Sequence, residues 1–435
     1  MDASSVAWWM FATLALTLMA RIPVAFALGL ACVPALVLDP TLNLTVLVTQ
    51  AFSMFNSFIL LAVPFFLLAA HLMNSGGITD KLFALTRSMV GHFPGSLAQV
   101  NVVLSVLFAG VSGSSTADAA SQSKLFVEAQ VKEGYDLGFS VAVTAVSSVL
   151  AVVIPPSILM IVWGGTLNTS ISALYLAGLL PGILLALAQM ATVYGYARLR
   201  NYPRYERASF GEFLRAGWLA VPALLTPAII VGGKIFGWFT ATESAAVAVL
   251  YSMALVALLY RELQWPKLRD ALLETGKLTS VTLFCLGTAA VFGWLLAYYR
   301  IPQTLVSSLA GLHLGSLGTA ALIAGVFLLV GCFLDAIPAI VIVGTVLDPL
   351  AQAAGVDPVH FGIVSITALA FGLVTPPYGL CLLISCAAVN VKISAVLKDV
   401  MIMLVPMLLV LLAVILLPDV FLFLPKTFGA FGGAQ

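Results

Sequence analysis

The 435 residues are 62% hydrophobic and 9% charged, with a formal net charge of +1. Globular domains carry about a quarter charged residues, so this composition excludes an ordinary water-soluble protein and indicates the lipid bilayer as the main surrounding. The near-neutral balance also gives no indication of a nucleic-acid partner.

Apolar segments of about 20 residues, the length that crosses a bilayer, predict about ten crossings. The first follows no basic region and has no clear cleavage site, so we expect a retained span rather than a signal peptide. In chain order, the crossings centre on Leu14, Leu30, Phe65, Val146, Leu184, Pro227, Leu250, Leu286, Leu369 and Leu409. Two further stretches, about 96–132 and 315–354, are each interrupted near the middle by small and polar residues. Their halves are too short to cross separately, which predicts two re-entrant hairpins.

Motifs recur at a constant displacement of 221 residues, from GYD at Gly134 to GVD at Gly355 and from IPPS at Pro155 to TPPY at Pro376. The recurrence predicts an internal duplication. The first repeat is expected to cover 1–197, with a broken helix at about 136–168, and the second 217–435, with a broken helix at about 358–389. A cytoplasmic connector over 198–216 joins them. Each copy would hold an odd number of crossings, so the two would have inverted topology.

Charge orients these repeats. Placing the arginine-rich connector in the cytoplasm leaves only Lys234, Arg300 and Lys426 of the 19 lysines and arginines outside, as the positive-inside rule requires. Both termini are then periplasmic, the first hairpin enters from the cytoplasm, and the second enters from outside.

Four interruptions lie at membrane depth, at 110–120, 153–157, 331–339 and 374–379. Backbone that is not helical must there line a polar cavity enclosed by protein. The first proline of each tandem pair ends a helix, and the chain can restart as a helix after it. Each break would then expose carbonyl groups, which suit a sodium ion, beside N–H groups, which suit a carboxylate. This plan is typical of secondary transporters.

Polar side chains at these interruptions are the candidate site residues. In the first hairpin tip, serine and threonine hydroxyls could coordinate an ion or a substrate, or could cap the returning helix. Asp335 in the second tip could bind an ion, or could cap the helix that continues through Pro338. Asp118 lies one turn inside the first return helix, while Ser157 and Thr375 flank the proline breaks. By contrast, the spacing of Lys124, Glu128 and Lys132 predicts a solvated helix face.

Taken together, GHFPGSLAQVNVVLSVLFAGVSGSSTADAA, EGYDLGFSVAVTAVSSVLAVVIPPSILMIVWG, FLDAIPAIVI and VTPPYGLCLLIS make the chain resemble the large membrane subunit of tripartite ATP-independent periplasmic (TRAP) transporters. The likeness covers nearly the whole sequence. Two segments depart from the family: SQSKLFVEAQVKE is more charged than the usual apolar version, and TATES stands where TPTE is commoner.

The resemblance implies an all-α polytopic membrane protein of the bacterial inner membrane that moves a transport domain against a scaffold, like an elevator. It further implies import of small organic acids, such as dicarboxylates or sialic acids, coupled to sodium, with no other cofactor. A small four-helix membrane subunit and a periplasmic binding protein would be its partners. By matching motif, the sodium-binding residues would be Ser112, Gly113, Ser114, Ile154, Pro155, Gly331, Asp335, Thr375 and Pro376. Substrate contacts would come from Ser115, Thr116, Asp118, Ser157 and Pro377.

Three other functions remain to be weighed. A self-sufficient sodium/carboxylate symporter could have similar inverted hairpins but would need no partner proteins. An intramembrane enzyme would need a serine paired with lysine or histidine, two facing aspartates, or an HExxH motif, and the sequence shows none of these patterns. A channel would conduct without sodium coupling.

The orientation can be tested by cysteine labelling. A cysteine in place of Ser209, within the arginine-rich connector, should react with a membrane-impermeant thiol reagent only from the cytoplasmic side. A cysteine in place of Gly429 should react only from outside. The opposite pattern would invert the topology.

Overall fold

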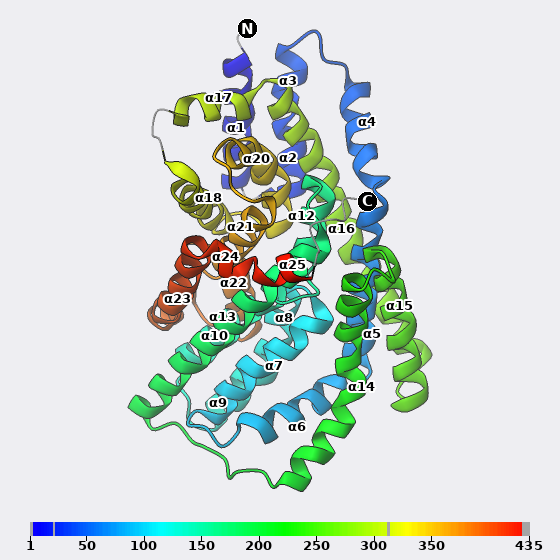
Figure 1. Ribbon diagram of the computed structural model, residues 1–435, viewed down its shortest axis with the longest axis vertical. Helices are drawn as coiled ribbons and strands as arrows, with labels where there is room; N and C mark the ends of the chain where they lie inside the picture. Colours follow the sequence, from blue (N-terminus) through cyan, green and yellow to red (C-terminus); the bar gives the residue numbers. More distant parts are fainter. Residues whose placement is uncertain (1–2, 21, 311–313, 429–435) are drawn as a thin grey trace.

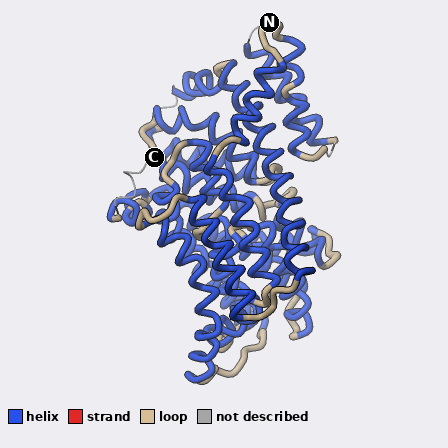
Figure 2. Tube along the Cα trace, turned by 90° about the vertical axis from the view of Figure 1, so that its right-hand side faces the viewer, coloured by secondary structure: helices blue, strands red, loops and turns tan. Residues whose placement is uncertain are grey.

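The computed structural model describes residues 3–20, 22–310 and 314–428, and this part of the chain forms helices joined by turns and loops, without strands (Figure 1). Gly429, one of the two labelling positions, lies outside the described residues. Figure 2 shows several long helices running along the long axis of the molecule.

The first half contains a helical hairpin between 96 and 132, followed by a helix that breaks between Val153 and Ile158, as predicted. Its two segments, Leu137–Val153 and Ile158–Leu167, are bent by 43°. The elements are α1 (Ala3–Met19), α2 (Val24–Ala31), α3 (Val33–Leu38), α4 (Leu44–Phe55), η1 (Phe58–Leu61), α5 (Ala62–Ser75), α6 (Ile78–Val90), α7 (Ser96–Ser112), α8 (Ser115–Gln122), η2 (Ser123–Val127), α9 (Glu128–Lys132), α10 (Leu137–Ser148), α11 (Leu150–Val153), α12 (Ile158–Leu167) and α13 (Ile171–Arg200).

The second half contains the second hairpin, between 315 and 353, and a helix interrupted between Gly372 and Leu380. Both return helices include a five-residue π-helical turn, η2 in the first hairpin and η4 in the second. The elements are α14 (Phe210–Ile235), α15 (Ala241–Ala254), η3 (Leu255–Leu259), α16 (Trp265–Tyr298), α17 (Ile301–Ala310), α18 (Gly315–Gly331), α19 (Ala336–Ala339), η4 (Ile340–Gly344), α20 (Thr345–Ala353), α21 (Pro358–Gly372), α22 (Leu380–Ala388), α23 (Ile393–Leu416), α24 (Pro418–Phe421) and α25 (Phe423–Thr427).

Seven described helices are long and apolar enough to cross a membrane, or eight if the bent pair counts as one span. The predicted crossings near Leu14, Leu30 and Leu369 form shorter apolar helices of 10–17 residues. The seven include Ala336–Ala353, the return helix of the second hairpin, so the prediction that each half of this hairpin is too short to cross was wrong for this half, because the helix continues through the π-helical turn η4. Length and composition thus support a polytopic membrane protein built from helices.

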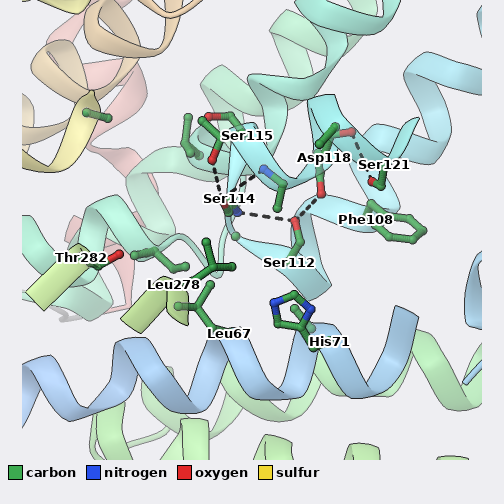
Figure 3. A pocket seen from close by; sticks show the side chains of 18 of the residues that line it. Leu67, His71, Phe108, Ser112, Ser114, Ser115, Asp118, Ser121, Leu278 and Thr282 are labelled. Atoms are coloured by element: carbon green, nitrogen blue, oxygen red, sulfur yellow. Dashed lines mark hydrogen bonds between the residues drawn. The ribbon is translucent and has the colours of Figure 1, made fainter. Parts of the chain in front are cut away.

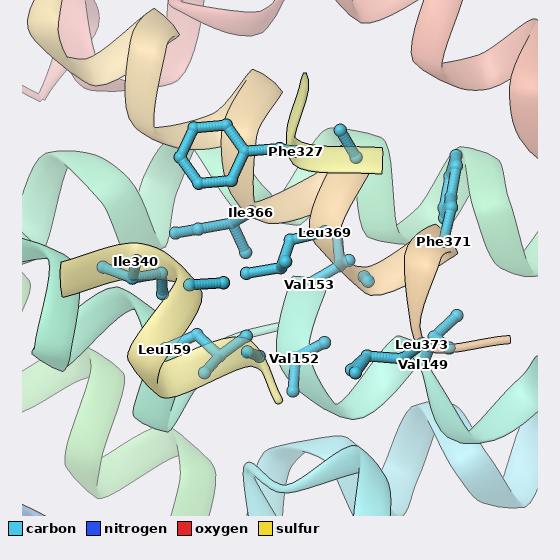
Figure 4. Packing of buried hydrophobic residues seen from close by; sticks show 14 of the residues in the cluster. Val149, Val152, Val153, Leu159, Phe327, Ile340, Ile366, Leu369, Phe371 and Leu373 are labelled. Atoms are coloured by element: carbon cyan, nitrogen blue, oxygen red, sulfur yellow. The ribbon is translucent and has the colours of Figure 1, made fainter. Parts of the chain in front are cut away.

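The hairpins and broken helices pack into the centre of the molecule. In the first half α7 contacts α10 and α11, and in the second α18 contacts α21. The halves also interlock, because α8 packs against α22 and η4 packs against α12. Figure 4 shows Val152 and Val153 of α11 in one apolar layer with Leu369 of α21. The interrupted backbone segments therefore lie next to a dry core.

Peripheral helices surround this centre. Helix α16 contacts α2, α4 and α5, while α15 packs on α5 and α14 packs on α6. Their outer faces leave large apolar side chains exposed, among them Phe52, Trp218 and Leu250. Such surfaces are unfavourable in water and suit contact with lipid or another membrane subunit.

Hydrogen bonds fasten the segment between α13 and α14 to the base of the first hairpin. The Pro203 carbonyl accepts the N–H groups of Gly95 and Ser96 at 3.2 and 3.3 Å, and the Tyr205 N–H donates to the Gly91 carbonyl at 3.0 Å. Figure 1 shows this segment beside α6 and α9, at the end of the molecule opposite the N-terminus.

Arg200, the last residue of α13, bridges two carboxylates at the same end. Its guanidinium lies 2.6 Å from Asp136 and 3.1 Å from Asp399 of α23. The Tyr202 hydroxyl also donates to Asp136 at 2.7 Å. These two donors, the hydroxyl first, hold the pKa of Asp136 below its usual value. The two ion pairs join α10, α13 and α23.

Glycine allows α18 and α21 to approach closely, which gives a stability test. A Cβ atom at Gly372 of α21 would lie 2.6 Å from the Gly331 Cα of α18. By contrast, a Cβ atom at Gly325 of α18 would meet nothing within 4 Å. Gly372→Ala should therefore destabilise the protein by about 1–3 kcal/mol through overpacking. Thermal unfolding in detergent should show a lower midpoint for Gly372→Ala and no loss for Gly325→Ala. Equal midpoints for the two variants would contradict the close packing.

Candidate substrate and ion site

A cavity of about 610 Å³ lies between the first hairpin tip, the start of the second return helix, and the peripheral helices α5 and α16. Figure 3 shows Ser112, Ser114, Ser115 and Asp118 at the tip, with Leu67 and His71 projecting from α5 toward them. Seven predicted site residues line the cavity: Ser112, Gly113, Ser114, Ser115, Thr116, Asp118 and Asp335.

The first tip turns at Gly113, whose φ of +60° lies in the left-handed region that glycine adopts without strain. Ser114 is the N-cap of α8 and accepts a hydrogen bond from the Ala117 N–H at 3.5 Å, while its hydroxyl lies 3.2 Å from that of Thr116. Capping and a place at the cavity therefore coexist at Ser114.

Asp118 supports the same turn from within. The Ser112 hydroxyl donates to one Asp118 carboxylate oxygen at 2.6 Å. The side chain is 1% exposed, and its other oxygen has no hydrogen-bond partner among the described residues. An unsatisfied carboxylate oxygen is costly to bury. Asp118 is thus positioned to accept a proton, a cation or a hydrogen bond from a ligand.

The first break lies directly against this tip. Helix α11 ends at Val153, and Ile154 has an extended backbone. The chain then passes through Pro155 and restarts at Ile158, whose N–H donates to the Gly113 carbonyl at 3.3 Å. The Ser157 hydroxyl donates to the Val152 carbonyl at 2.7 Å, which leaves its oxygen lone pairs able to accept. Ile154, Pro155 and Ser157 are buried and do not line the cavity.

The second tip meets its own break in a similar way. The Gly379 N–H donates to the Cys332 carbonyl at 3.4 Å, and the Thr375 hydroxyl donates to the Phe371 carbonyl at 2.7 Å. Asp335 caps α19 by accepting the Ala336 N–H at 2.7 Å, and it also lines the cavity. Both functions considered for Asp335 are therefore compatible.

The remaining predicted residues of the second break lie outside the cavity. Gly331, at the end of α18, is buried against α21. Thr375 and Pro376 are half-buried, and Pro377 is exposed. The structure thus brings Asp335, but not these four, together with the first hairpin tip.

Both hairpin carboxylates face one cavity although their hairpins are expected to enter from opposite sides. Asp118 and Asp335 both line it, and Glu274 of α16 adds a third carboxylate. The start of α8, where Ser114 is the cap, contributes N–H groups nearby. This combination of hydroxyls, carboxylates and a helix N-terminus can hold a cation and an anion at adjacent positions.

Sequence reasoning missed the wall of the cavity that α5 and α16 supply. His71 and Asn74 come from α5, and Glu274 and Thr282 come from α16. Lys124, predicted to lie on a solvated face, also lines the cavity. Polar residues within apolar spans were the available signal, but nothing in their spacing related these helices to the hairpin tip.

A buried polar network, also missed, ties the first hairpin to the first broken helix. Asn101 of α7 donates to Thr144 of α10 at 2.7 Å. Ser105 of α7 donates to Gln122 of α8 at 2.8 Å and lies 3.0 Å from Ser147 of α10. Buried networks of this kind favour one arrangement of the helices around them, although the amide nitrogen of Gln122 has no hydrogen-bond partner among the described residues. Hydrogen bonds thus connect α7 of the first hairpin both to its own return helix α8 and to α10 of the broken helix.

Comparison with known proteins identifies the class. The model of the tripartite ATP-independent periplasmic transporter family, DctM component, matches residues 11–420. The sialic acid TRAP transporter large permease protein SiaM of Vibrio cholerae is 36% identical over 95% of this chain and 97% of its own length. The C4-dicarboxylate TRAP transporter large permease protein DctM of Pseudomonas aeruginosa is 34% identical over 88% and 90%.

The fold has a solved counterpart. The YdaH transporter of Alcanivorax borkumensis superposes with a TM-score of 0.58 over 89% of each chain at 16% sequence identity, a similarity of fold alone. The family match covers nearly the whole chain, and the helices have the length and apolar character of membrane spans. The protein therefore belongs to the DctM family of large membrane subunits of TRAP transporters and is a multi-pass transporter permease, not an enzyme.

Proposed function

We propose that this permease is a sodium-coupled importer of small organic acids in the bacterial inner membrane. The observation that carries the proposal is the cavity at which the first hairpin tip meets Asp335 of the second. Related permeases are named for sialic acid and for C4-dicarboxylates, and both substrates are organic anions. A dicarboxylate or a sialic-acid-like anion is thus the proposed cargo.

The oxygen atoms at the two tips suit sodium, a hard cation that prefers hydroxyl, carbonyl and carboxylate ligands. In the first repeat these would come from Ser112, Gly113 and Ser114 with Ile154 and Pro155. In the second they would come from Gly331, Asp335 and Thr375 with Pro376. Gly113 already accepts a hydrogen bond across the first break, and Cys332 does so across the second, so each tip is fixed before an ion binds.

The anion would bind beside these ions, at the start of α8. N–H groups at a helix N-terminus favour a carboxylate, and the hydroxyls of Ser115 and Thr116 begin that helix. Asp118, Ser157 and Pro377 are the other proposed contacts, although only Asp118 lines the cavity in this conformation. Sodium bound nearby would offset the repulsion between Asp118 and an anion.

An elevator movement suits the division between central and peripheral helices. In this proposal the hairpins, the broken helices, α13 and α23 move as the transport domain, while α1 to α6 and α14 to α17 form the scaffold. Each sodium ion moving inward through 100 mV would release about 2.3 kcal/mol, to which its concentration gradient adds. Two ions could therefore concentrate an anion strongly.

A small four-helix membrane subunit and a periplasmic binding protein complete the proposed transporter. The exposed apolar faces of the peripheral helices could contact such a subunit, and the binding protein would deliver the anion from the periplasm. Both chain termini are proposed to face that side.

Site variants test the sodium assignment. Asp335→Ala and Ser114→Ala should each raise the sodium concentration needed for half-maximal uptake by about tenfold, because each removes an oxygen ligand. Asp80→Ala, at an exposed carboxylate outside the cavity, serves as the control. Uptake of radiolabelled anion into proteoliposomes, measured over a series of sodium concentrations, provides the readout. Unchanged sodium activation in both site variants would remove the assignment.

Reconstitution distinguishes this transporter from a self-sufficient symporter. Proteoliposomes that hold this chain alone should show no sodium-driven uptake, and activity should appear when the small subunit and the binding protein are added. Full uptake by the isolated chain would favour the symporter, while conduction without sodium would favour a channel.

A further inference from the structure

Lys124 lies both on an exposed helix face and at the wall of the cavity. Its spacing with Glu128 and Lys132 predicts a solvated face, and all three side chains are exposed, but only Lys124 of the three also lines the cavity. The π-helical turn Ser123–Val127 begins just before it and changes the direction in which the following side chains point. The exposed charged face thus borders the cavity at Lys124.

The Lys124 ammonium has no ionic partner. Among the residues that the structure describes, none of the ion pairs involves Lys124, and it is the only lysine or arginine lining the cavity. The carboxylates of Asp118, Asp335 and Glu274 share that cavity, with His71 as the remaining titratable group. Without Lys124, the walls would offer an entering anion mainly negative charge.

Lys124 lies in η2, directly after α8, on the same return helix as the tip residues. Thr116, Ala117, Ala120, Ser121 and Lys124 all line the cavity, so they form one face of the return helix. Ten residues separate Ser114 from Lys124, about 15 Å at the rise of an α-helix. Long side chains on a helix lean back toward its N-terminus, which for Lys124 is the direction of the Ser114 hydroxyl.

The second hairpin has no equivalent cation. Its π-helical turn, Ile340–Gly344, consists of apolar residues and glycine, and it is largely buried. The positive charge therefore belongs to the first hairpin alone, at the end of the cavity nearest the arginine-rich connector. That end is the one expected to face the cytoplasm.

We propose that Lys124 is a specificity-determining residue that makes this end of the cavity attractive to the carboxylate of the transported anion. It offsets Glu274 and the two hairpin carboxylates, and it receives the anion between the tip and the cytoplasmic opening. The inference rests on the proposed transport of organic anions, but the charge that it assigns can be measured without any cargo.

A reporter cysteine measures the local potential. Ser121→Cys places a thiol in the cavity one turn before Lys124, and the five native cysteines are buried. Inside-out membrane vesicles holding the complete transporter are treated with anionic sulfonatoethyl and with cationic trimethylammonioethyl methanethiosulfonate. Lys124→Gln should lower the ratio of the anionic to the cationic rate about fivefold, because one unit charge about 8 Å away in water changes each rate by slightly more than twofold, in opposite directions.

Matched variants separate this effect from a change in folding. Lys124→Arg should keep the wild-type ratio, and Lys132→Gln, which removes an exposed lysine of the same segment, should leave it unchanged. In proteoliposomes, Lys124→Gln should raise KM for uptake of succinate or sialic acid, whichever is carried, by a similar factor. An unchanged ratio in Lys124→Gln, or an equal fall in Lys132→Gln, would overturn the inference. A fall confined to Lys124→Gln, with no organic acid carried by the wild type, would overturn the proposed function while supporting the charge assigned to Lys124.

Discussion

The need to satisfy backbone groups where helices are interrupted shapes this protein. Inside a membrane each unpaired N–H or C=O costs several kcal/mol, so an interruption persists only where another interruption or a polar cavity meets it. Here the interruptions meet in pairs. The Ile158 N–H reaches the Gly113 carbonyl, and the Gly379 N–H reaches the Cys332 carbonyl. Each hairpin tip is therefore attached to one broken helix, and that attachment places both tips at the centre.

Two kinds of contact stabilise this central region: apolar packing and side-chain hydrogen bonds. Small residues at Gly331 and Gly372 let α18 and α21 approach closely, while apolar side chains of α11 and α21 fill the layer between the halves. The network around Asn101 and Ser105 fixes the first hairpin to α10. The cavity remains where neither kind of contact is complete, at the end of α7 and along one face of α8.

The sequence predictions that succeeded rest on residues whose effect is local, on their own stretch of backbone. Tandem prolines and clusters of glycine, serine and aspartate located both hairpins and both breaks, because these residues act on their own backbone. The cavity wall from α5 and α16 depends on tertiary packing, and α4, which is too short for a span, was not predicted. Sequence analysis predicted two equivalent breaks, yet Pro156 is buried and its counterpart Pro377 is exposed. The inverted relation of the repeats and the sodium sites remain predictions.

The hydrogen bonds between the 91–96 turn and the segment after α13 have a mechanical consequence. The chain passes from peripheral to central helices at the first of these places and returns at the second. The bonds couple the start of α7 to the segment that leaves α13, while residues 206–209 separate the bonded segment from α14. Helices α6 and α14 also pack together. In the proposed elevator movement, this end of the molecule would act as a double tether whose short length limits how far the central helices travel.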